Sequence, residues 1–253
     1  MILAIDVGNT NIVAGCCEGD KILLMERFTT NHNATMLEYA ILINAVLEMA
    51  KIKKESITGA IISSVVPAVT DTIRAAIRKL TNVDALVVGP GIKTGLTIKT
   101  DNPAQLGSDL VVDAVAGISE YGAPLVVFDL GTATTVSVIN DRNEYVGGMI
   151  MPGVMISLNA MVSGTSQLPK ISLDPPKKLI GTNTVDCMKS GILYGTAASM
   201  DGVIDRIRGE IGDAKVVATG GLAGKIVPLC RNEIIHDDEL LIKGLMLLYN
   251  KNA

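Results

Sequence analysis

The sequence is poor in the residues on which many binding sites depend. It has no Trp, two Phe and five Tyr, so aromatic side chains make up 3% of its 253 residues. A nucleobase or other ring held mainly by stacking on an aromatic platform is therefore not expected. Histidine occurs twice, as His32 and His236, each in polar surroundings. A His-based catalytic triad or metal site is therefore not expected either.

Cysteine is also scarce. The four cysteines, Cys16, Cys17, Cys187 and Cys230, form no CxxC pair, and no secretory signal is expected, because Asp6 interrupts the first apolar run. This pattern favours a reducing compartment in which all four serve as small core residues. Cys16 and Cys17 are neighbours in an apolar stretch, so a strand there would point them to opposite faces.

Neither sign of charge dominates, and no apolar run is long. The formal net charge is −4, and the largest basic cluster is the KIKK at 51–54, which is typical of a solvated helix end. A nucleic-acid partner would require a clustered basic face. The apolar runs fall far short of the ~20 residues that a membrane span needs. We therefore expect a cytoplasmic protein with no nucleic-acid or membrane partner.

Strand and helix patterns alternate along the chain. Strands are predicted at 2–6, 12–17, 21–28, 59–64, 85–88, 125–129, 134–140, 144–147 and 215–218. Helices are predicted at 34–50, 67–79, 106–121, 154–162, 184–209, 221–230 and 237–250. Each half opens with three strands before its helices, which predicts an α/β fold with mixed sheets. Neither GxxxxGK followed by Ser or Thr nor GxGxxG occurs, so P-loop and Rossmann sites are unsupported.

One phrase occurs twice. Asp6-Val7-Gly8-Asn9-Thr10 and Asp129-Leu130-Gly131-Thr132-Ala133 each follow an apolar strand and lead into a second one. This repeat predicts a duplicated domain, with the two copies facing each other across a cleft. The YGAP at 121–124 breaks the preceding helix, so the expected domains are 1–121 and 122–253.

The repeated turns suit a polyphosphate. Gly lets the backbone approach an anion, and the N–H groups of such a turn can point at phosphate oxygens. An Asp beside that turn would repel a bare phosphate, so a Mg²⁺ between them is expected. The alternative is that each Asp only caps its own turn.

Three other segments are informative. VVATGGLA at 216–223 predicts a strand and then a helix whose N-terminus could admit a ligand, although Gly-Gly between a strand and a helix is common. Asp109 and Asp113 lie four apart on one predicted helix, where they could supply a general base or form a solvated acidic face. The segment 163–183 is one long loop, a feature that is often functional.

Several phrases together resemble the type III pantothenate kinases, which belong to the acetate kinase, sugar kinase, Hsp70 and actin superfamily. They are DVGNTN at 6–11, GSDL at 107–110, DLGTATT at 129–135 and ATGG at 218–221, with further likeness at 61–70, 87–96, 101–103, 147–153, 183–195 and 243–249. The resemblance therefore spans nearly the whole chain.

The resemblance implies two duplicated ribonuclease H-like domains with ATP in the cleft between them. It implies ATP-binding roles for Asp6, Val7, Gly8, Asn9, Thr10, Asn11, Ile12, Val13, Thr132, Gly220 and Gly221. Asp6 would help to place Mg²⁺ through water, and Asp129 would hold a monovalent cation, K⁺ or NH₄⁺. The residues bordering pantothenate would be Thr100, Gly107, Ser108, Asp109, Leu110 and Thr184. Asp109 would be the general base in a phosphoryl transfer from ATP to pantothenate, the first step of coenzyme A synthesis, by a homodimeric enzyme.

Three positions depart from the family's usual phrases. Thr100 stands where Tyr is usual before DNP, Leu110 where Arg is usual after Asp109, and Gly164 where Arg is usual before the LP at 168–169. Losing an Arg removes a permanent charge and up to five donors beside a carboxylate-bearing substrate. Two alternatives therefore stay open at this point: a kinase of another small hydroxylated acceptor, and a non-catalytic nucleotide-binding paralogue. A hydrolase of the related phosphatase branch is a more remote one.

Overall fold

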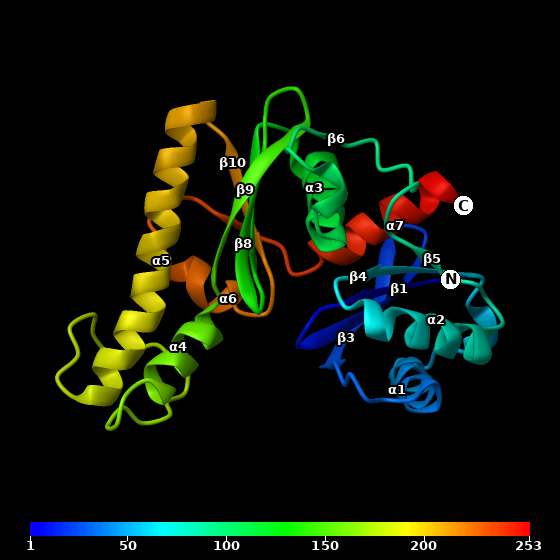
Figure 1. The fold of residues 1–253 in the computed structure, drawn as a ribbon, viewed down its shortest axis with the longest axis horizontal. Helices are drawn as coiled ribbons and strands as arrows, with labels where there is room; N and C mark the ends of the chain where they lie inside the picture. Colours follow the sequence, from blue (N-terminus) through cyan, green and yellow to red (C-terminus); the bar gives the residue numbers. More distant parts are fainter. The chain divides into compact units, whose positions relative to one another are not determined.

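The computed structural model describes residues 1–253, which form two compact units (Figure 1). Unit 1 consists of Met1–Leu96, Asp101–Glu120 and Glu239–Ala253, and unit 2 consists of Thr97–Thr100 and Tyr121–Asp238. The main part of unit 2 begins at Tyr121, whereas the sequence placed the boundary after residue 121. The units differ from the expected domains at two places, because Thr97–Thr100 belong to unit 2 and residues 239–253 return to unit 1.

Unit 1 contains a five-stranded sheet in the order β3-β2-β1-β4-β5. Its strands are β1 (Ile2–Val7), β2 (Asn11–Glu18), β3 (Lys21–Thr29), β4 (Gly59–Ser64) and β5 (Leu86–Val87). Its helices are α1 (Met36–Met49), α2 (Pro67–Thr81), α3 (Ser108–Tyr121) and α7 (Leu240–Asn252), with 3₁₀ turns at Lys54–Ser56 and Pro103–Gln105. β2 runs antiparallel to β1, whereas β4 runs parallel to it, so the sheet is mixed as predicted.

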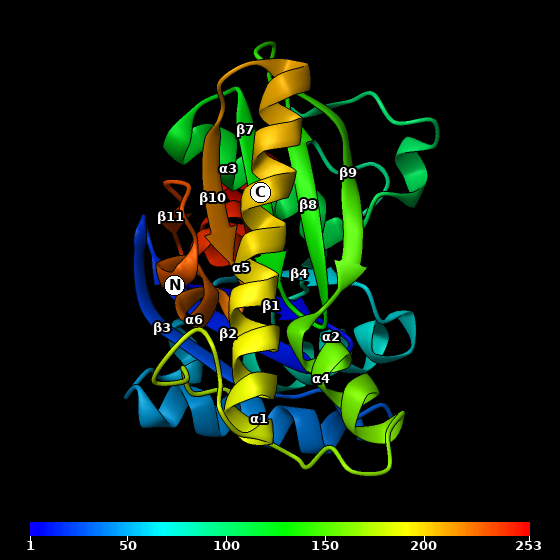
Figure 2. The ribbon, with the colours of Figure 1, turned by 90° about the vertical axis from the view of Figure 1, so that its left-hand side faces the viewer.

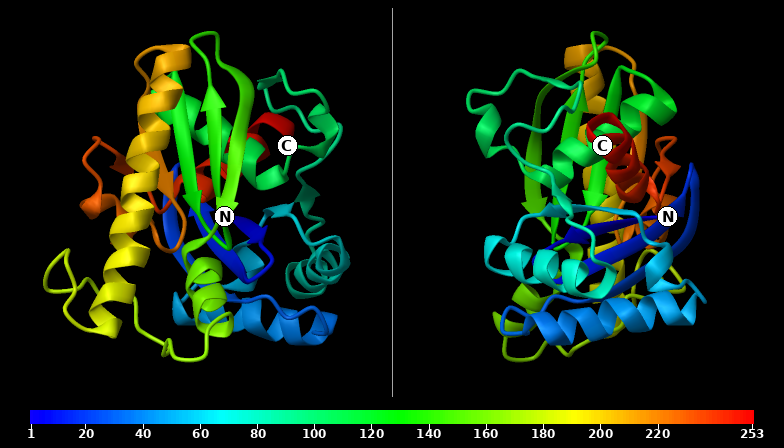
Figure 3. Two further views of the ribbon diagram at one scale, coloured as in Figure 1. Left: turned by 60° about the vertical axis from the view of Figure 1, so that its left-hand side comes forward. Right: turned by 90° about the vertical axis from the view of Figure 1, so that its right-hand side faces the viewer.

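Helices cover both faces of this sheet (Figure 3, right). Alternate residues of β1, such as Leu3 and Ile5, pack with α1 and α2, while Ala4 packs with α3 and α7. Cys16 and Cys17 lie in these two opposite clusters, as their adjacency in a strand predicted, and a register shift separates them. Burial raises the pKa of the Cys17 thiol to about 12, which fits a structural and unreactive side chain.

Unit 2 contains a six-stranded sheet in the order β11-β10-β7-β8-β9-β6. Its strands are β6 (Thr97–Ile98), β7 (Leu125–Leu130), β8 (Ala133–Ile139), β9 (Glu144–Pro152), β10 (Lys215–Thr219) and β11 (Ile235–His236). Its helices are α4 (Val154–Ser163), α5 (Thr184–Ile211) and α6 (Ala223–Ile226), followed by a 3₁₀ turn at Val227–Leu229. The long helix α5 runs along one face of the sheet (Figure 2). There Met188, Leu193 and Met200 pack against Val126 and Phe128 of β7.

The two sheets repeat one topology. Each contains three consecutive antiparallel strands, and the first of them also pairs with a later parallel strand: β1 with β4, and β7 with β10. A second parallel strand, β5 or β11, extends the same edge. Sheet 2 differs by the added strand β6, which pairs with β9. The duplicated α/β architecture expected from the repeated Asp-containing phrase is confirmed.

The predicted elements differ from the structure in a few places. β9 continues to Pro152 beyond the predicted end at 147, because Gly147 and the register shift opposite it form a bulge and not a strand end. The helix predicted at 221–230 is reduced to α6 and a 3₁₀ turn that contains Pro228. Cys187 is exposed rather than part of a core. No helix has both the length and the apolar character needed to cross a bilayer.

Candidate functional site

The first repeated turn joins β1 to β2 and places Asp6 at the end of a buried strand. Asp6 pairs with Val13 in the antiparallel ladder and with Ser63 of β4 in the parallel one. Because its neighbours Ile5 and Val7 pack under α1 and α2, Asp6 faces the α3–α7 side of the sheet, together with Ser63. Its exposed fraction is 9%. A carboxylate is thus held at the carboxyl end of the central strand of sheet 1.

The turn itself is closed by hydrogen bonds. The Gly8 amide donates to the Asn11 carbonyl oxygen at 3.0 Å. Thr30, which directly follows β3, donates its hydroxyl to the Gly8 carbonyl oxygen at 2.6 Å and its amide to the Thr10 carbonyl oxygen at 2.9 Å. Asn9 and Thr10 are exposed. The turn therefore offers an accessible backbone and polar side chains, which suits contact with an anion.

The N-terminus of α3 is fastened beside this turn. The Ser108 hydroxyl accepts from the Ser63 hydroxyl at 3.0 Å and from the Ser64 amide at 3.1 Å, and it donates to the Ser64 carbonyl oxygen at 3.0 Å. Ser63 is the register partner of Asp6, and Ser108 precedes Asp109. The structure therefore brings the Asp6 strand end and the Asp109 helix start together within unit 1.

Asp109 lies in the first turn of α3 and is half-buried. Its Oδ1 accepts a hydrogen bond from the Leu110 amide at 2.9 Å, and a Cβ on Gly107 would overlap that same oxygen. Burial raises the pKa of Asp109, and the backbone amides oppose that shift. A carboxylate with a raised pKa is a better proton acceptor, as a general base requires. Asp113, by contrast, has 1% exposure, so the alternative of a solvated acidic face is wrong for it.

The second repeated turn joins β7 to β8 and carries Asp129. Asp129 pairs with Thr135 in the antiparallel ladder and with Thr219 of β10 in the parallel one. Gly220, with φ at +92°, follows Thr219, and a Cβ there would overlap Asp129 Oδ1 and lie 2.7 Å from the Leu130 nitrogen. The backbone after β10 therefore passes close to the carboxylate, which requires glycine.

A second glycine supports this turn from the other side. A Cβ on Gly153, the N-cap of α4, would overlap the Thr132 carbonyl oxygen and lie 2.9 Å from the Gly131 carbonyl oxygen. Thr132 itself is exposed. The hydroxyl of Thr134 is buried, and it has no hydrogen-bond partner in the protein. Because Thr134 pairs with Leu130, whose side chain packs in the core cluster under α5, the Thr134 hydroxyl lies on the opposite face of the sheet from Asp129.

The segment after β10 differs from its expected form. Gly220 and Gly221 precede α6, which is four residues long. So short a helix has little macrodipole, because the dipole grows from many aligned peptide units. The helix-terminus argument for a ligand near residue 221 is therefore weak, and the contribution of Gly220 is its close approach to Asp129.

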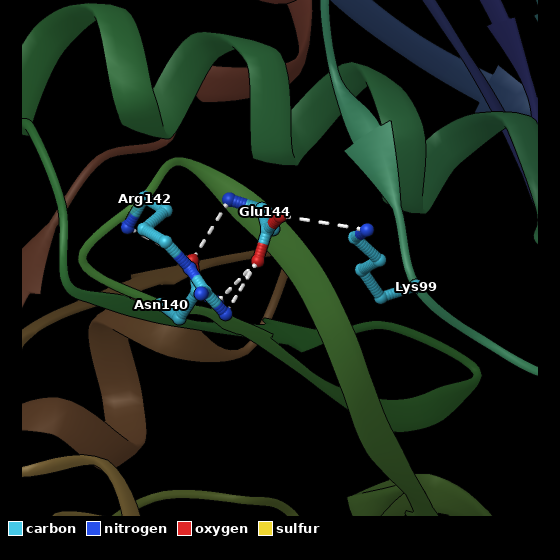
Figure 4. Close-up of polar contacts among 4 residues, drawn as sticks. All are labelled: Lys99, Asn140, Arg142 and Glu144. Atoms are coloured by element: carbon cyan, nitrogen blue, oxygen red, sulfur yellow. Dashed lines mark hydrogen bonds and ion pairs between the residues drawn. The ribbon is translucent and has the colours of Figure 1, made fainter.

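Thr100 lies two residues after the end of β6. Polar contacts of the neighbouring Lys99 tie this segment to Glu144 of β9 (Figure 4). Glu144 accepts a hydrogen bond from Asn140 Nδ2 at 2.8 Å and ion-pairs with Arg142 at 3.0 Å and with Lys99 at 3.7 Å. The hydrogen bond from Asn140, followed by the nearby cations, lowers the pKa of Glu144. The Thr100 hydroxyl is buried and has no partner in the protein.

The other residues expected near the acceptor lie on separate elements. Leu110 is half-buried in the first turn of α3. Thr184 is the first residue of α5, after the N-cap Asn183, at the end of the long loop that the sequence predicted. That end of α5 lies away from the β7–β8 turn in both views (Figures 1 and 2). Gly164 is the C-cap of α4.

Each repeated turn has one carboxylate, and the structure contains no group of three His, Cys, Asp or Glu side chains suited to hold a metal ion. This donor set fits Mg²⁺ bound through one carboxylate, water and phosphate oxygens better than a cage made of protein alone. It equally fits a monovalent cation at Asp129, beside the carbonyl oxygens of the turn.

Sequence reasoning missed three residues of this arrangement, namely Thr30, Ser63 and Gly153. Ser63 had a signal in the pair of serines that ends the apolar strand at 59–64. Gly153 lies in the segment 147–153 that resembles the family, but its contact with the turn, like that of Thr30, depends on the tertiary fold.

Comparison with known families identifies relatives over the full chain. The sequence profile described as type III pantothenate kinase matches residues 2–206. The chain is 43% identical over 253 residues to a type III pantothenate kinase of an Exiguobacterium species, covering 100% of this chain and 99% of that protein. It is 44% identical over 254 residues to a type III pantothenate kinase of Halalkalibacterium halodurans, covering 100% of both.

Solved structures share the fold at low sequence identity. A putative 2-dehydro-3-deoxygalactonokinase from Sinorhizobium meliloti matches with a TM-score of 0.60 at 12% identity, over 99% of this chain and 96% of that one. Similarity at this level concerns the fold alone. It agrees with the α/β architecture of two mixed sheets flanked by helices that the sequence predicted.

Proposed function

The chain belongs to the type III pantothenate kinase family, and we propose that it transfers the γ-phosphoryl group of ATP to pantothenate, giving ADP and 4′-phosphopantothenate. The observation that carries this proposal is identity above 40% along the whole chain to two proteins of that name. The geometry supports it, because one strand of each duplicated sheet leads from an Asp into a Gly-containing turn suited to phosphate, and the half-buried Asp109 lies at the start of α3, which is fastened to β4 beside Asp6.

In this proposal the first turn, Asp6 to Val13, binds the phosphates through its backbone amides and polar side chains, and Thr132 contacts them from the second turn. Gly220 and Gly221 border the adenosine. Asp6 and Asp129 face the cations, with Mg²⁺ placed through water at Asp6 and K⁺ or NH₄⁺ at Asp129. When bound, Mg²⁺ supplies positive charge that offsets the charge on the phosphoryl oxygens.

Asp109 acts as the general base. It accepts the proton of the primary hydroxyl group of pantothenate while that oxygen forms a bond to the γ-phosphorus, and the bond from the γ-phosphorus to the bridging oxygen of ADP breaks in line. Its half-buried position and raised pKa support this role. Thr100, Gly107, Leu110 and Thr184 line the acceptor.

The decisive experiment measures ADP release from ATP and Mg²⁺, with and without pantothenate, in K⁺ and then in Na⁺. We expect turnover that requires pantothenate, is stimulated by K⁺, and falls at least about 100-fold in Asp109→Asn, since general-base catalysis contributes about 10²–10⁴. Turnover with another hydroxylated metabolite but not pantothenate would reassign the acceptor. ATP binding without any turnover would indicate a non-catalytic paralogue.

We also propose a homodimer. Ile150 on β9 and Ile180 in the 164–183 loop are 79% and 81% exposed, and Met149, Met155, Ile156 and Leu179 of unit 2 are exposed as well. So many large apolar side chains on one unit are typical of a surface that another chain covers. Light scattering tests this: a monomeric mass at micromolar concentration would reject the dimer.

A cytoplasmic location fits the four unpaired cysteines. Cell fractionation checks it, and recovery of the protein outside the cytoplasmic fraction would contradict it.

A further inference from the structure

Ser108 differs from the other residues expected at the acceptor in that its hydroxyl is fully occupied. A serine hydroxyl has one donor and two acceptor positions. That of Ser108 donates to the Ser64 carbonyl oxygen at 3.0 Å, and it accepts from the Ser64 amide at 3.1 Å and from the Ser63 hydroxyl at 3.0 Å. Its hydrogen-bonding capacity is therefore used within unit 1, which leaves none for a substrate.

These bonds join two parts of unit 1 whose relative position matters for the proposed reaction, namely the Asp6 turn and the start of α3 that carries Asp109. Ser63 is fully buried and pairs with Asp6 across β4 and β1. On the other side, Ser108 stands one residue before Asp109 in the first turn of α3, which begins with the hydrogen bond from the Val111 amide to the Gly107 carbonyl oxygen at 3.2 Å. A displacement of Ser108 from β4 therefore moves the Asp109 carboxyl group relative to the first turn.

The hydroxyl network continues to α2. The Thr70 hydroxyl donates to the Ser64 hydroxyl at 2.7 Å, and the Ser64 hydroxyl accepts from the Val66 amide at 3.1 Å. β4 thus ends in bonds to a helix on each face of the sheet, α2 through Ser64 and α3 through Ser108. Of these two attachments, the one through Ser108 bears on Asp109.

We propose that Ser108 is a positioning residue, which fixes the start of α3 to the end of β4 so that Asp109 is held at a set distance from the Asp6 turn. Rather than contacting pantothenate, it acts through Asp109. This inference rests on the proposed kinase function for its catalytic readout.

The test compares Ser108→Ala with Thr70→Val, a matched control that removes a hydroxyl from the same network without touching α3. We expect kcat to fall about 10- to 100-fold in Ser108→Ala, since small misplacements of a reacting group cost up to about 10² in rate. The KM values for ATP and pantothenate should stay within about threefold of the wild type. Thr70→Val should keep kcat within about threefold, and Ser108→Thr, which retains the hydroxyl, should recover most of the loss.

Two results would overturn the proposal. A rise in the KM for pantothenate with unchanged kcat would show that Ser108 contacts the substrate. Equal losses of kcat in Ser108→Ala and Thr70→Val would show that the network only stabilises the fold. If Ser108→Ala does not fold, Ser63→Ala removes one of the three bonds and should lower kcat about three- to tenfold; unchanged kcat would contradict the proposal.

Hydrogen exchange separates this inference from the kinase assignment. The Ser64 amide is bonded to Ser108, and the Leu110 amide is bonded to Asp109. Both should exchange faster in Ser108→Ala, and the Leu110 amide should be unchanged in Thr70→Val, whichever acceptor the enzyme uses. An unchanged Leu110 amide in Ser108→Ala would refute the positioning role even if the protein phosphorylates pantothenate.

Discussion

The two repeated turns share a sequence pattern, yet they are held in different ways. In the first, four residues, 8–11, separate the paired Val7 and Ile12, and Thr30 binds the turn with two hydrogen bonds. In the second, three residues, 131–133, separate the paired Leu130 and Thr134, and the backbone packs against glycines. Duplication has therefore preserved the strand ends and the carboxylate, but not the means of supporting the turn.

This difference predicts that substitutions in the two turns will lower the stability of the protein by different amounts. In the first turn, removing the Thr30 hydroxyl breaks one of these two hydrogen bonds, which costs about 1 kcal/mol. A turn enclosed between glycines has no room for a methyl group, so adding one forces the backbone to move. Substitutions at matched places in the two copies should therefore have unequal effects.

Gly220→Ala should have the largest effect. The added Cβ would overlap Asp129 Oδ1 at a residue with φ at +92°, so steric and conformational costs combine to about 2–4 kcal/mol. Urea unfolding followed by circular dichroism measures the loss. The control is Gly209→Ala in α5, where a Cβ meets nothing within 4 Å and helix propensity favours Ala. Wild-type stability in Gly220→Ala would disprove the close packing.

Thr30→Val should have an intermediate effect. It removes the hydroxyl that donates to the Gly8 carbonyl oxygen and keeps the shape of the side chain, so the cost is about 1 kcal/mol. Because the first turn would loosen, the KM for ATP should rise while that for pantothenate changes little. Thr29→Val, at the exposed neighbouring position, is the control. A loss of stability equal to that of Gly220→Ala would contradict the claim that the two turns are supported in different ways.

The smallest effect on stability is expected for Asp109→Asn, and it should depend on pH. The folded-state pKa of Asp109 is raised by burial. Below its unfolded-state pKa the carboxyl is protonated in both states and has no linked cost. As the pH rises through the folded-state pKa, the ionised group destabilises the fold. Asp109→Asn should therefore be slightly more stable than the wild type at pH 7, with the difference vanishing in acid. Parallel unfolding curves at both pH values check this, and a variant less stable at pH 7 would contradict it.

The sequence predicted most of the elements because their signals are local. The apolar strands that lead into Asp6 and Asp129 and the helix that begins at Pro67 all appear in the structure. The repeated phrase also predicted the repeated topology, because similar strand patterns favour similar sheets; the added strand β6 was not predicted.

The supporting residues could not be predicted, because their roles depend on distant parts of the chain. Thr30 meets Gly8 across 22 residues, and Ser108 meets Ser64 across 44. Asp113 looked like half of a solvated pair at helical spacing, but its side of α3 is buried. The return of α7 to unit 1 was missed for the same reason, since an apolar helical pattern does not say which sheet it covers.

That return has a consequence for how the protein is made. α7 covers one face of sheet 1, where Gly244 packs against the backbone of α3 at Val112 and Ile242 meets Gly15 of β2. After Leu96 has been added to the growing chain, 142 more residues, 97–238, must follow before Glu239 is reached. At about 5–20 residues per second, that delay is roughly 7–28 s, during which the α7 side of the nascent sheet lacks its last helix. Unit 2, most of which is one continuous stretch, can be complete while unit 1 still waits. The first repeated turn is translated early, but the helical cover of the sheet that carries it is completed last.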